Sequence, residues 1–182
     1  MSRVSRVGSE MAPRAKTESQ SFRVDGRVLD SLKDEAKRDN VTLSSLVNQV
    51  LTQYVDYGRF ANRMNALSLA RKTFASILNA APEDDLVRIA EIEGRSSPIA
   101  FITSMNGHMN VENVVGFVKD LSEHANLFEY SVISHSPPTF TLVHELGVKW
   151  SLFLAHYLAE AFKSAGAQVK FSTSDRAVTF TL

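Results

Sequence analysis

The chain has 182 residues, 44% of them hydrophobic and 22% charged, a balance that is normal for a globular protein. The absence of cysteine excludes disulfides and thiolate metal sites, and the formal net charge of zero argues against a surface coated in positive charge. The sequence contains neither an apolar run of the about 18–20 residues that a membrane span needs nor the apolar segment of a secretory signal.

The first segment, residues 1–18, is polar and without periodicity, and we expect a disordered arm. From Met1 to Arg27 six basic residues face three acidic ones, a net charge of +3. A short basic arm ahead of a folded module is a weak indication of nucleic-acid binding, because many inert tails share this composition.

A lone strand is expected over residues 19–25, where polar and apolar residues alternate. Phe22 and Val24 share its apolar face. No second strand is near enough in the sequence to form a hairpin, and the unpaired backbone groups of a lone strand are costly unless a partner satisfies them. The opposite face carries Ser19, Ser21 and Arg23.

Two helices are expected after this strand. Asp25 suits the N-cap of the first, and Asn40 tolerates the left-handed conformation that ends such a helix. Thr42 suits the N-cap of the second, which is expected to reach about Gly58. The apolar residues at helical spacing are Val28, Leu29, Leu32 and Ala36, followed by Leu43, Leu46, Val47, Val50, Leu51 and Tyr54.

An α+β domain with helices and two β-hairpins is expected over residues 66–182. Periodicity predicts helices over residues 61–79, from Pro82, from Asn110 and over residues 146–165, while β-rich runs predict one hairpin over residues 127–144 and another near the end. Residues 99–103 fit either a helix, which Ser97–Pro98 favours as cap and first turn, or a buried strand. A strand there would allow a ferredoxin-like fold, by analogy alone.

The helix over residues 146–165 is apolar around more of its circumference than one-sided burial requires. It should therefore be enclosed on two sides, either by its own domain or by a second subunit. We expect the fragment of residues 66–182 to self-associate through such an interface.

The stretch SQSFRVDGRVLDSLKDEAKRDNVTLSSLVNQVL, about a fifth of the chain, resembles the ribbon-helix-helix DNA-binding family of the Arc, MetJ and CopG type. The resemblance implies a β-α-α module over residues 19–60 in which the strands of two chains pair into an antiparallel ribbon on an intertwined dimer. Related proteins usually carry glycine where this chain has Asn40, and asparagine can adopt the same left-handed geometry.

The resemblance also implies a set of contacts with double-stranded DNA. The ribbon would enter the major groove, where Arg23 can donate two hydrogen bonds to guanine, and the start of the second helix would bind a phosphate. The expected base contacts are Ser19, Ser21 and Arg23; the phosphate contacts are Arg27, Thr42, Leu43, Ser44 and Ser45; the dimer core is Phe22, Val24, Leu29, Leu32, Leu46, Val47 and Val50.

No metal, cofactor or catalytic site is expected. A nickel-sensing relative of this family uses a ligand set that includes cysteine, which this chain lacks. The aromatic residues of the helix over residues 146–165 indicate a core, and we find neither a Gly-rich phosphate loop nor a nucleophile elbow. The five histidines have no pair at i, i+2 or i, i+4 spacing: His108, His124, His135, His144 and His156.

These features favour a prokaryotic, sequence-specific transcriptional regulator, more a repressor than an activator, which binds DNA as a homodimer or higher homo-oligomer. Such a protein would be cytoplasmic and associated with the nucleoid. Its C-terminal domain would dimerise, oligomerise along DNA, or bind an unknown effector or protein partner. The alternatives are an antitoxin that represses its own operon, and an interaction scaffold whose ribbon serves dimerisation alone.

Overall fold

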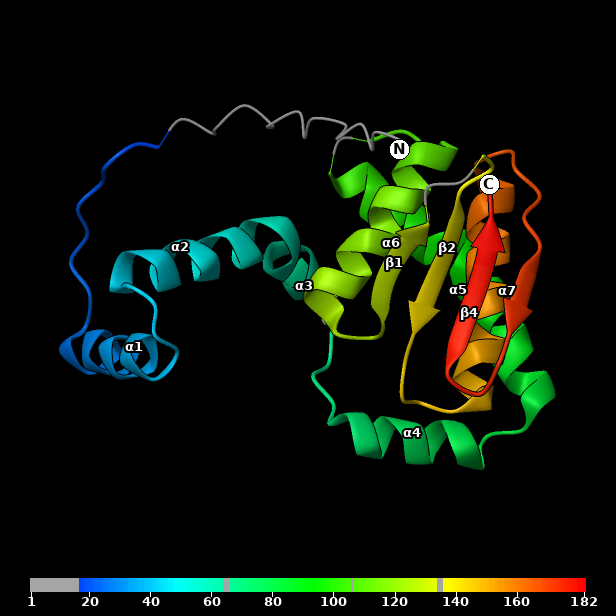
Figure 1. Cartoon of the computed structure of the whole chain (residues 1–182), viewed down its shortest axis with the longest axis horizontal. Coiled ribbons are helices and arrows are strands. Elements are labelled where there is room, and N and C mark those ends of the chain that lie inside the picture. The colour runs from blue at the N-terminus through cyan, green and yellow to red at the C-terminus, as the bar shows by residue number, and fades with distance from the viewer. Residues whose placement is uncertain (1–16, 64–65, 106, 134–135) are drawn as a thin grey trace, which may run out of the picture. The chain divides into compact units, whose positions relative to one another are not determined.

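The computed structural model describes residues 17–63, 66–105, 107–133 and 136–182 (Figure 1). The chain divides into two compact units, one up to Val47 and one from Asn48 to Leu182, and each is described by itself. No helix in the described ranges is long and apolar enough to cross a membrane.

The caps of the first two helices lie where the sequence predicts them. α1 (Gly26–Arg38) begins after Asp25, whose carboxylate accepts a hydrogen bond of 2.9 Å from the backbone N–H two residues further on. α2 (Leu43–Gln53) begins after Thr42, whose hydroxyl accepts the backbone N–H of Ser45 at 3.1 Å. Each cap satisfies an N–H group that has no acceptor within its helix.

The turn between α1 and α2 is also as expected. Asn40 has a φ of 54°, in the left-handed region. The backbone N–H of Val41 then donates to the carbonyl oxygen of Ala36 at 2.9 Å, which satisfies a carbonyl at the end of α1. Ala36 and Leu46 are the buried residues of α1 and α2.

The expected strand over residues 19–25 is not formed in the single chain. Residues 17–25 have neither helix nor strand, and the strands of the described residues all lie between Glu129 and Thr181. The physical reason is that a strand exists through its ladder of hydrogen bonds to a neighbour, and the described part of this chain places no strand beside residues 19–25. The β-α-α arrangement is therefore not shown.

The second unit is an α+β fold. Helix α2 is followed directly by a π-helical turn and a short helix. Among the described residues, four helices come between this turn and the first strand of the sheet. In chain order the elements after α2 are η1 (Tyr54–Gly58), α3 (Arg59–Arg63), α4 (Arg71–Ala80), α5 (Glu83–Ser104), α6 (Val111–Ala125), β1 (Glu129–Ile133), β2 (Thr139–Val143), α7 (Val148–Ser164), β3 (Phe171–Thr173) and β4 (Ala177–Thr181).

The sheet is antiparallel throughout, in the order β1-β2-β4-β3. The two expected hairpins, β1–β2 and β3–β4, are present, and β2 pairs with β4 to join them. Alternate residues of β2 and β4 point into the core. Phe140 lies directly opposite Phe180, with stacked rings whose centroids are 4.9 Å apart, and both side chains are buried.

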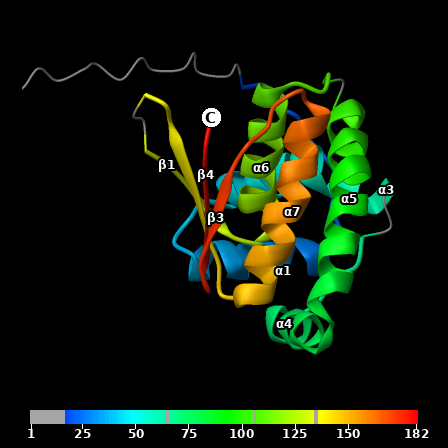
Figure 2. The ribbon, with the colours of Figure 1, turned by 90° about the vertical axis from the view of Figure 1, so that its right-hand side faces the viewer.

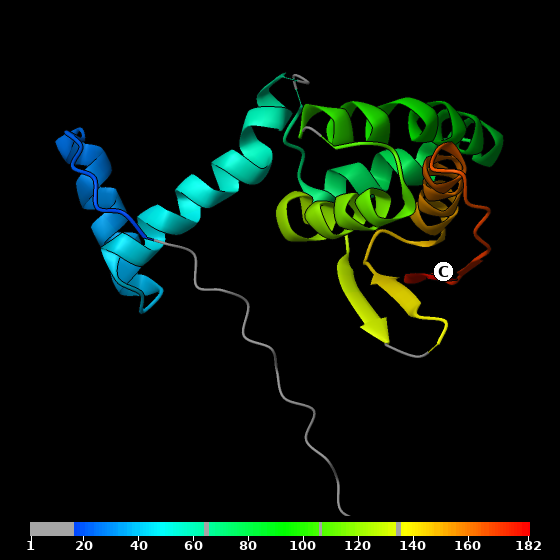
Figure 3. The ribbon, with the colours of Figure 1, turned by 90° about the horizontal axis from the view of Figure 1, so that it is seen from above.

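The helices of the second unit lie on one face of the sheet (Figure 2; Figure 3 shows the strands below the helices). α7 lies next to β3 and β4 on one side and next to α5 on the other, so that α7 separates α5 from the sheet. Buried residues therefore surround much of α7. They are Trp150, Ser151, Leu154, Ala155, Leu158, Ala161 and Phe162.

This arrangement corrects one step of the sequence analysis. α7 is enclosed on two sides, as expected, but its own domain encloses it. The apolar circumference of α7 therefore gives no support to self-association of residues 66–182, because little of it remains for a second subunit.

Residues 99–103 are helical, the alternative that the sequence favoured, so the condition for a ferredoxin-like fold is not met. The expected helix start at Ser97–Pro98 is wrong, because these residues lie inside α5, which begins at Glu83 and continues through Pro98. The single helix expected over residues 61–79 is wrong: α3 ends at Arg63, residues 66–70 are irregular, and α4 begins at Arg71. Leu67 is 94% exposed, so its apolar spacing did not reflect burial.

The close approach of α5 and α7 depends on Gly94. A Cβ atom at this position would collide with the backbone carbonyl oxygen of Tyr157 on α7. Glycine is thus required here by the packing of two backbones and not by a special φ angle.

We expect Gly94→Ala to lower the free energy of unfolding by about 1–3 kcal/mol or more, because α5 and α7 must separate to admit the methyl group. Gly116→Ala in α6 is the matched control. A Cβ at Gly116 meets nothing within 4 Å, so this change should raise the free energy of unfolding by about 0.5–1 kcal/mol. Urea denaturation of both variants measures the difference, and equal effects would contradict the packing described.

Candidate functional site

The residues assigned to DNA bases lie in the irregular segment ahead of α1. Ser19, Ser21 and Arg23 are exposed to solvent in the single chain. Their side chains come directly before the Asp25 cap, which fixes the point where the segment enters α1. All three are therefore available to a ligand, and the structure does not by itself put them on one strand face.

The residues assigned to phosphate gather at the start of α2. The first N–H groups of a helix have no acceptor within it, and the Thr42 hydroxyl takes that of Ser45. The N–H groups of Leu43 and Ser44 then point out of the helix end, where the helix dipole favours an anion. Arg27 is at the start of α1, with its Nε 3.6 Å from a carboxylate oxygen of Asp25.

The residues assigned to the dimer core divide by burial. Phe22 is 72% exposed and Val24 50% exposed in the single chain, and Val50 is exposed as well. Leu46 is buried, whereas Leu29, Leu32 and Val47 are half-buried. The single chain thus leaves large apolar side chains in water, a condition that marks an interaction surface. Val28, which the core assignment omitted although it lies on the expected stripe, is exposed too.

The second unit contains a cavity of about 690 Å³ that the sequence did not indicate. Arg71 donates from its guanidinium to the backbone carbonyl of Asn126 at 3.1 Å, and the His124 ring stacks on Tyr57 with centroids 5.9 Å apart. Apolar walls with a few polar groups are typical of small-molecule sites. The lining residues are Tyr57, Ala61, Asn62, Ala66, Leu67, Ser68, Leu69, Arg71, Phe74, His124, Ala125, Asn126, Leu127 and Leu146.

One group of potential metal ligands occurs among the described residues, at the surface of α6. Ligand atoms of Asp120, Glu123 and His124 lie within 4.8 Å of one another. Burial raises the pKa of the Asp120 carboxyl, and the charge of Asp56 on η1 acts in the same direction. A search for histidine pairs missed this spacing, which a search for mixed carboxylates and histidine would have found. Exposed acidic groups are common without an ion, so the cluster carries no metal assignment.

The remaining histidines have separate surroundings. His156 Nδ1 lies 3.6 Å from a Glu91 carboxylate oxygen, His108 is exposed, and His135 is outside the described residues. His144 is buried together with Ser151.

A hydrogen-bond chain satisfies His144 inside the second unit. The Ser151 hydroxyl donates to the carbonyl oxygen of Ser174 at 2.6 Å and accepts from His144 Nε2 at 2.8 Å. His144 Nδ1 accepts the backbone N–H of Leu146 at 3.3 Å. This pattern requires a neutral imidazole that carries its proton on Nε2. Burial lowers the pKa of His144 from its ordinary 6.5, although the charge of Asp175 opposes the shift.

The free energy of unfolding should therefore decrease as the pH falls from about 7.5 to about 5, with His144 contributing a slope of at most about 1.4 kcal/mol per pH unit. The unfolded chain takes up a proton on this histidine near its ordinary pKa, while the folded chain resists protonation. In His144→Gln the slope should be shallower by the His144 contribution. Urea denaturation at several pH values measures the slope, with His108→Gln, at an exposed histidine, as the control for the substitution itself.

Comparison of the chain with protein-family models, with curated proteins and with solved structures found no match. The functional assignment consequently depends on the residues and geometry described above.

Proposed function

We propose that the chain is a sequence-specific DNA-binding transcriptional regulator, more a repressor than an activator. It binds double-stranded DNA as a homodimer, through a two-stranded β-ribbon formed by residues 19–25 of two copies. On this proposal the protein works in the cytoplasm, associated with the nucleoid.

The observation that carries the proposal is the state of residues 19–25 in the single chain. Phe22 and Val24 are largely exposed, and the backbone around them has no strand partner in the described part of the chain. Antiparallel pairing with the same segment of a second copy would bury the apolar side chains against the helices and satisfy the backbone groups at once. Folding of this segment and dimerisation would then be coupled.

The same pairing would give the DNA contacts their geometry. Side chains alternate between the two faces of a strand. With Phe22 and Val24 turned inward, Ser19, Ser21 and Arg23 turn outward. A two-stranded ribbon fits the major groove, where an arginine fork can donate to O6 and N7 of guanine. The N-terminus of α2, capped by Thr42 with Ser44 beside it, would meet the phosphate backbone.

The second unit would supply assembly or regulation. Its cavity, which Arg71 and His124 line together with apolar residues, would be the place for a small effector. Among the alternative functions, an interaction scaffold would lack the steep salt dependence that counterion release gives to DNA binding. No specific contact among the described residues favours an antitoxin.

The dimer is tested by Phe22→Ala in the full chain. If the single chain were the working state, the loss of a side chain this exposed would change the free energy of unfolding by at most about 0.5 kcal/mol. In a dimer core the same change should cost about 3–5 kcal/mol and shift the protein towards monomer in sedimentation velocity. Leu67→Ala, at a more exposed leucine, is the control. If Phe22→Ala has no larger effect than the control, residues 19–25 do not form the proposed ribbon.

The DNA contacts are tested with a duplex selected from random sequences. Arg23→Ala should weaken binding to this duplex by about 1–3 kcal/mol and relax the preference at one base pair per half-site. Arg27→Ala should instead weaken binding to all sequences alike and reduce the salt slope by about one. Unchanged specificity in Arg23→Ala would show that this side chain does not face the bases.

A further inference from the structure

α5 has a second apolar side that its own domain leaves uncovered. The buried residues of this 22-residue helix face α6 and α7. At about 100° per residue, three isoleucines fall on the opposite side of the helix. Figure 2 shows α7 between α5 and the sheet. Ile89, Ile92 and Ile99 are 43%, 52% and 38% exposed.

The spacing of this side is that of a coiled-coil seam. Ile89, Ile92, Ser96 and Ile99 follow one another at steps of three, four and three residues, as the a and d positions of a heptad do. Pro98 is buried on the other side of the helix, so its ring does not obstruct the seam. We refer to these four residues as the α5 stripe.

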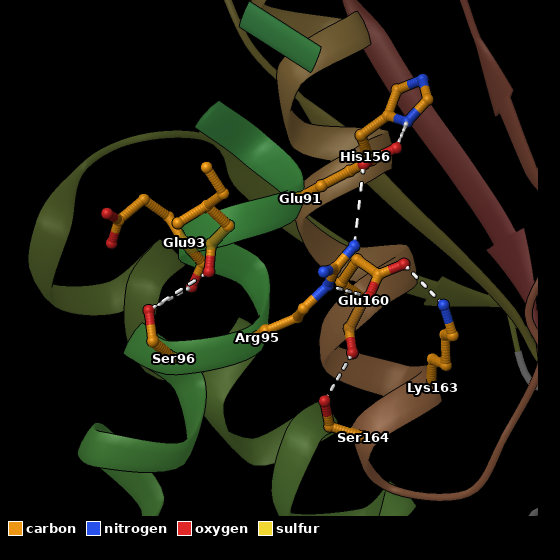
Figure 4. Close-up of polar contacts among 9 residues, drawn as sticks. Glu91, Glu93, Arg95, Ser96, His156, Glu160, Lys163 and Ser164 are labelled. Carbon is orange, nitrogen blue, oxygen red and sulfur yellow. Dashed lines mark hydrogen bonds and ion pairs between the residues drawn. The ribbon is translucent and has the colours of Figure 1, made fainter. Parts of the chain in front are cut away.

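Ser96 does not prevent burial of the α5 stripe. Its hydroxyl donates to the carbonyl oxygen of Ile92 one turn earlier, at 3.3 Å (Figure 4). A hydroxyl that is satisfied within its own helix can be buried with little cost. The stripe therefore presents a continuous surface to a partner helix.

The charges beside the α5 stripe are self-complementary. Arg88 occupies the position before Ile89 (g of the heptad), and Glu93 the position after Ile92 (e of the heptad). In a parallel, in-register pair each g side chain meets an e side chain of the other helix, so arginine meets glutamate twice. In an antiparallel pair like positions meet, and arginine would face arginine.

Glu93 accepts a hydrogen bond of 2.8 Å from the Ser97 hydroxyl on one carboxylate oxygen, and a carboxylate can accept from a second donor as well. Arg95 is held by Glu160 on α7, with Nε 2.7 Å from a carboxylate oxygen, and is thereby directed towards its own domain (Figure 4). Asp85, one step before the stripe, is paired with Arg88 at 3.0 Å. The guanidinium of Arg88 is exposed and has donors left for a second carboxylate.

We propose that the α5 stripe pairs with the same stripe of a second copy, as a parallel, in-register helix pair. Self-complementary charge identifies the partner as another copy of this chain. Two heptads form a weak contact by themselves, and a second linkage between the same two copies would raise their effective concentration. The pairing is separate from the proposed ribbon and from DNA binding.

The chain lacks cysteine, so single cysteines can report the pairing in the full-length protein. Ile89→Cys and Ile99→Cys are made separately and oxidised without DNA. The two positions are about 15 Å apart along the helix, and a disulfide needs Cα atoms within about 7 Å. A parallel, in-register pair brings each residue beside its own copy, so both variants should form linked dimers on a non-reducing gel.

The matched control is Ile77→Cys on α4, a similarly exposed isoleucine outside the α5 stripe. Both stripe variants should cross-link at least about tenfold faster than this control, because proximity replaces diffusional encounter. Rates equal to that of the control would overturn the proposal. Cross-linking of one stripe variant alone, or a disulfide between an Ile89→Cys chain and an Ile99→Cys chain when the two are mixed, would contradict a parallel, in-register pair and overturn the proposal equally.

Charge reversal tests the identity of the partner. In the Ile92→Cys background, Arg88→Glu or Glu93→Arg should each slow cross-linking, since like charges then meet. Arg88→Glu and Glu93→Arg together should restore the rate, because opposite charges then meet again between the two helices. Failure of the double reversal to restore it would refute pairing between copies. Arg23→Ala should leave the rate unchanged, which separates this test from that of DNA binding.

Discussion

The second unit depends on the burial of α7 on two sides. Its apolar circumference is too wide for a helix that lies on a sheet alone, and the fold covers the remaining side with α5. That contact is close because Gly94 lets the backbone of α5 approach the backbone of α7 at Tyr157. The sheet, α6 and the ion pairs between α5 and α7, such as Arg95 with Glu160, are arranged around this central helix.

The same constraint explains the exposed side of α5. α5 buries one apolar side against α7, yet it also has isoleucines on the side away from α7. Apolar surface that no element of the chain covers stays exposed to water unless a partner buries it. Phe22 and Val24 also expose apolar surface, and the backbone of their segment has no strand partner in the described structure. Association between copies is what we propose for both places, by a strand in one case and by a helix in the other.

If the chain is the DNA-binding regulator that we propose, association through two separate surfaces would have a functional consequence. If the ribbon joins two chains and the α5 stripe joins the same two, the contacts reinforce each other through effective concentration. If the stripe joins different dimers, the product is a larger assembly that can occupy adjacent DNA sites. A ligand in the cavity near Arg71 and His124 would act on the same unit that carries the stripe.

The sequence by itself determined the local structure correctly wherever the signal is local. The caps at Asp25, Thr42 and Asn110, the left-handed turn at Asn40 and the two hairpins are formed as predicted, because each depends on residues a few positions apart. The α+β class followed from the same signals. Of the candidate site, the sequence identified the residues of the proposed DNA interface, and their roles stay predictions.

Only the tertiary structure decided what covers each apolar surface. Periodicity showed that α7 is buried on two sides, but not that α5 rather than a second chain buries it. The apolar residue Leu67 matched a helical pattern and is exposed, whereas the cavity beside it has no sequence signature at all. The physical reason is that spacing fixes which side chains share a face, while burial depends on which distant segment packs there.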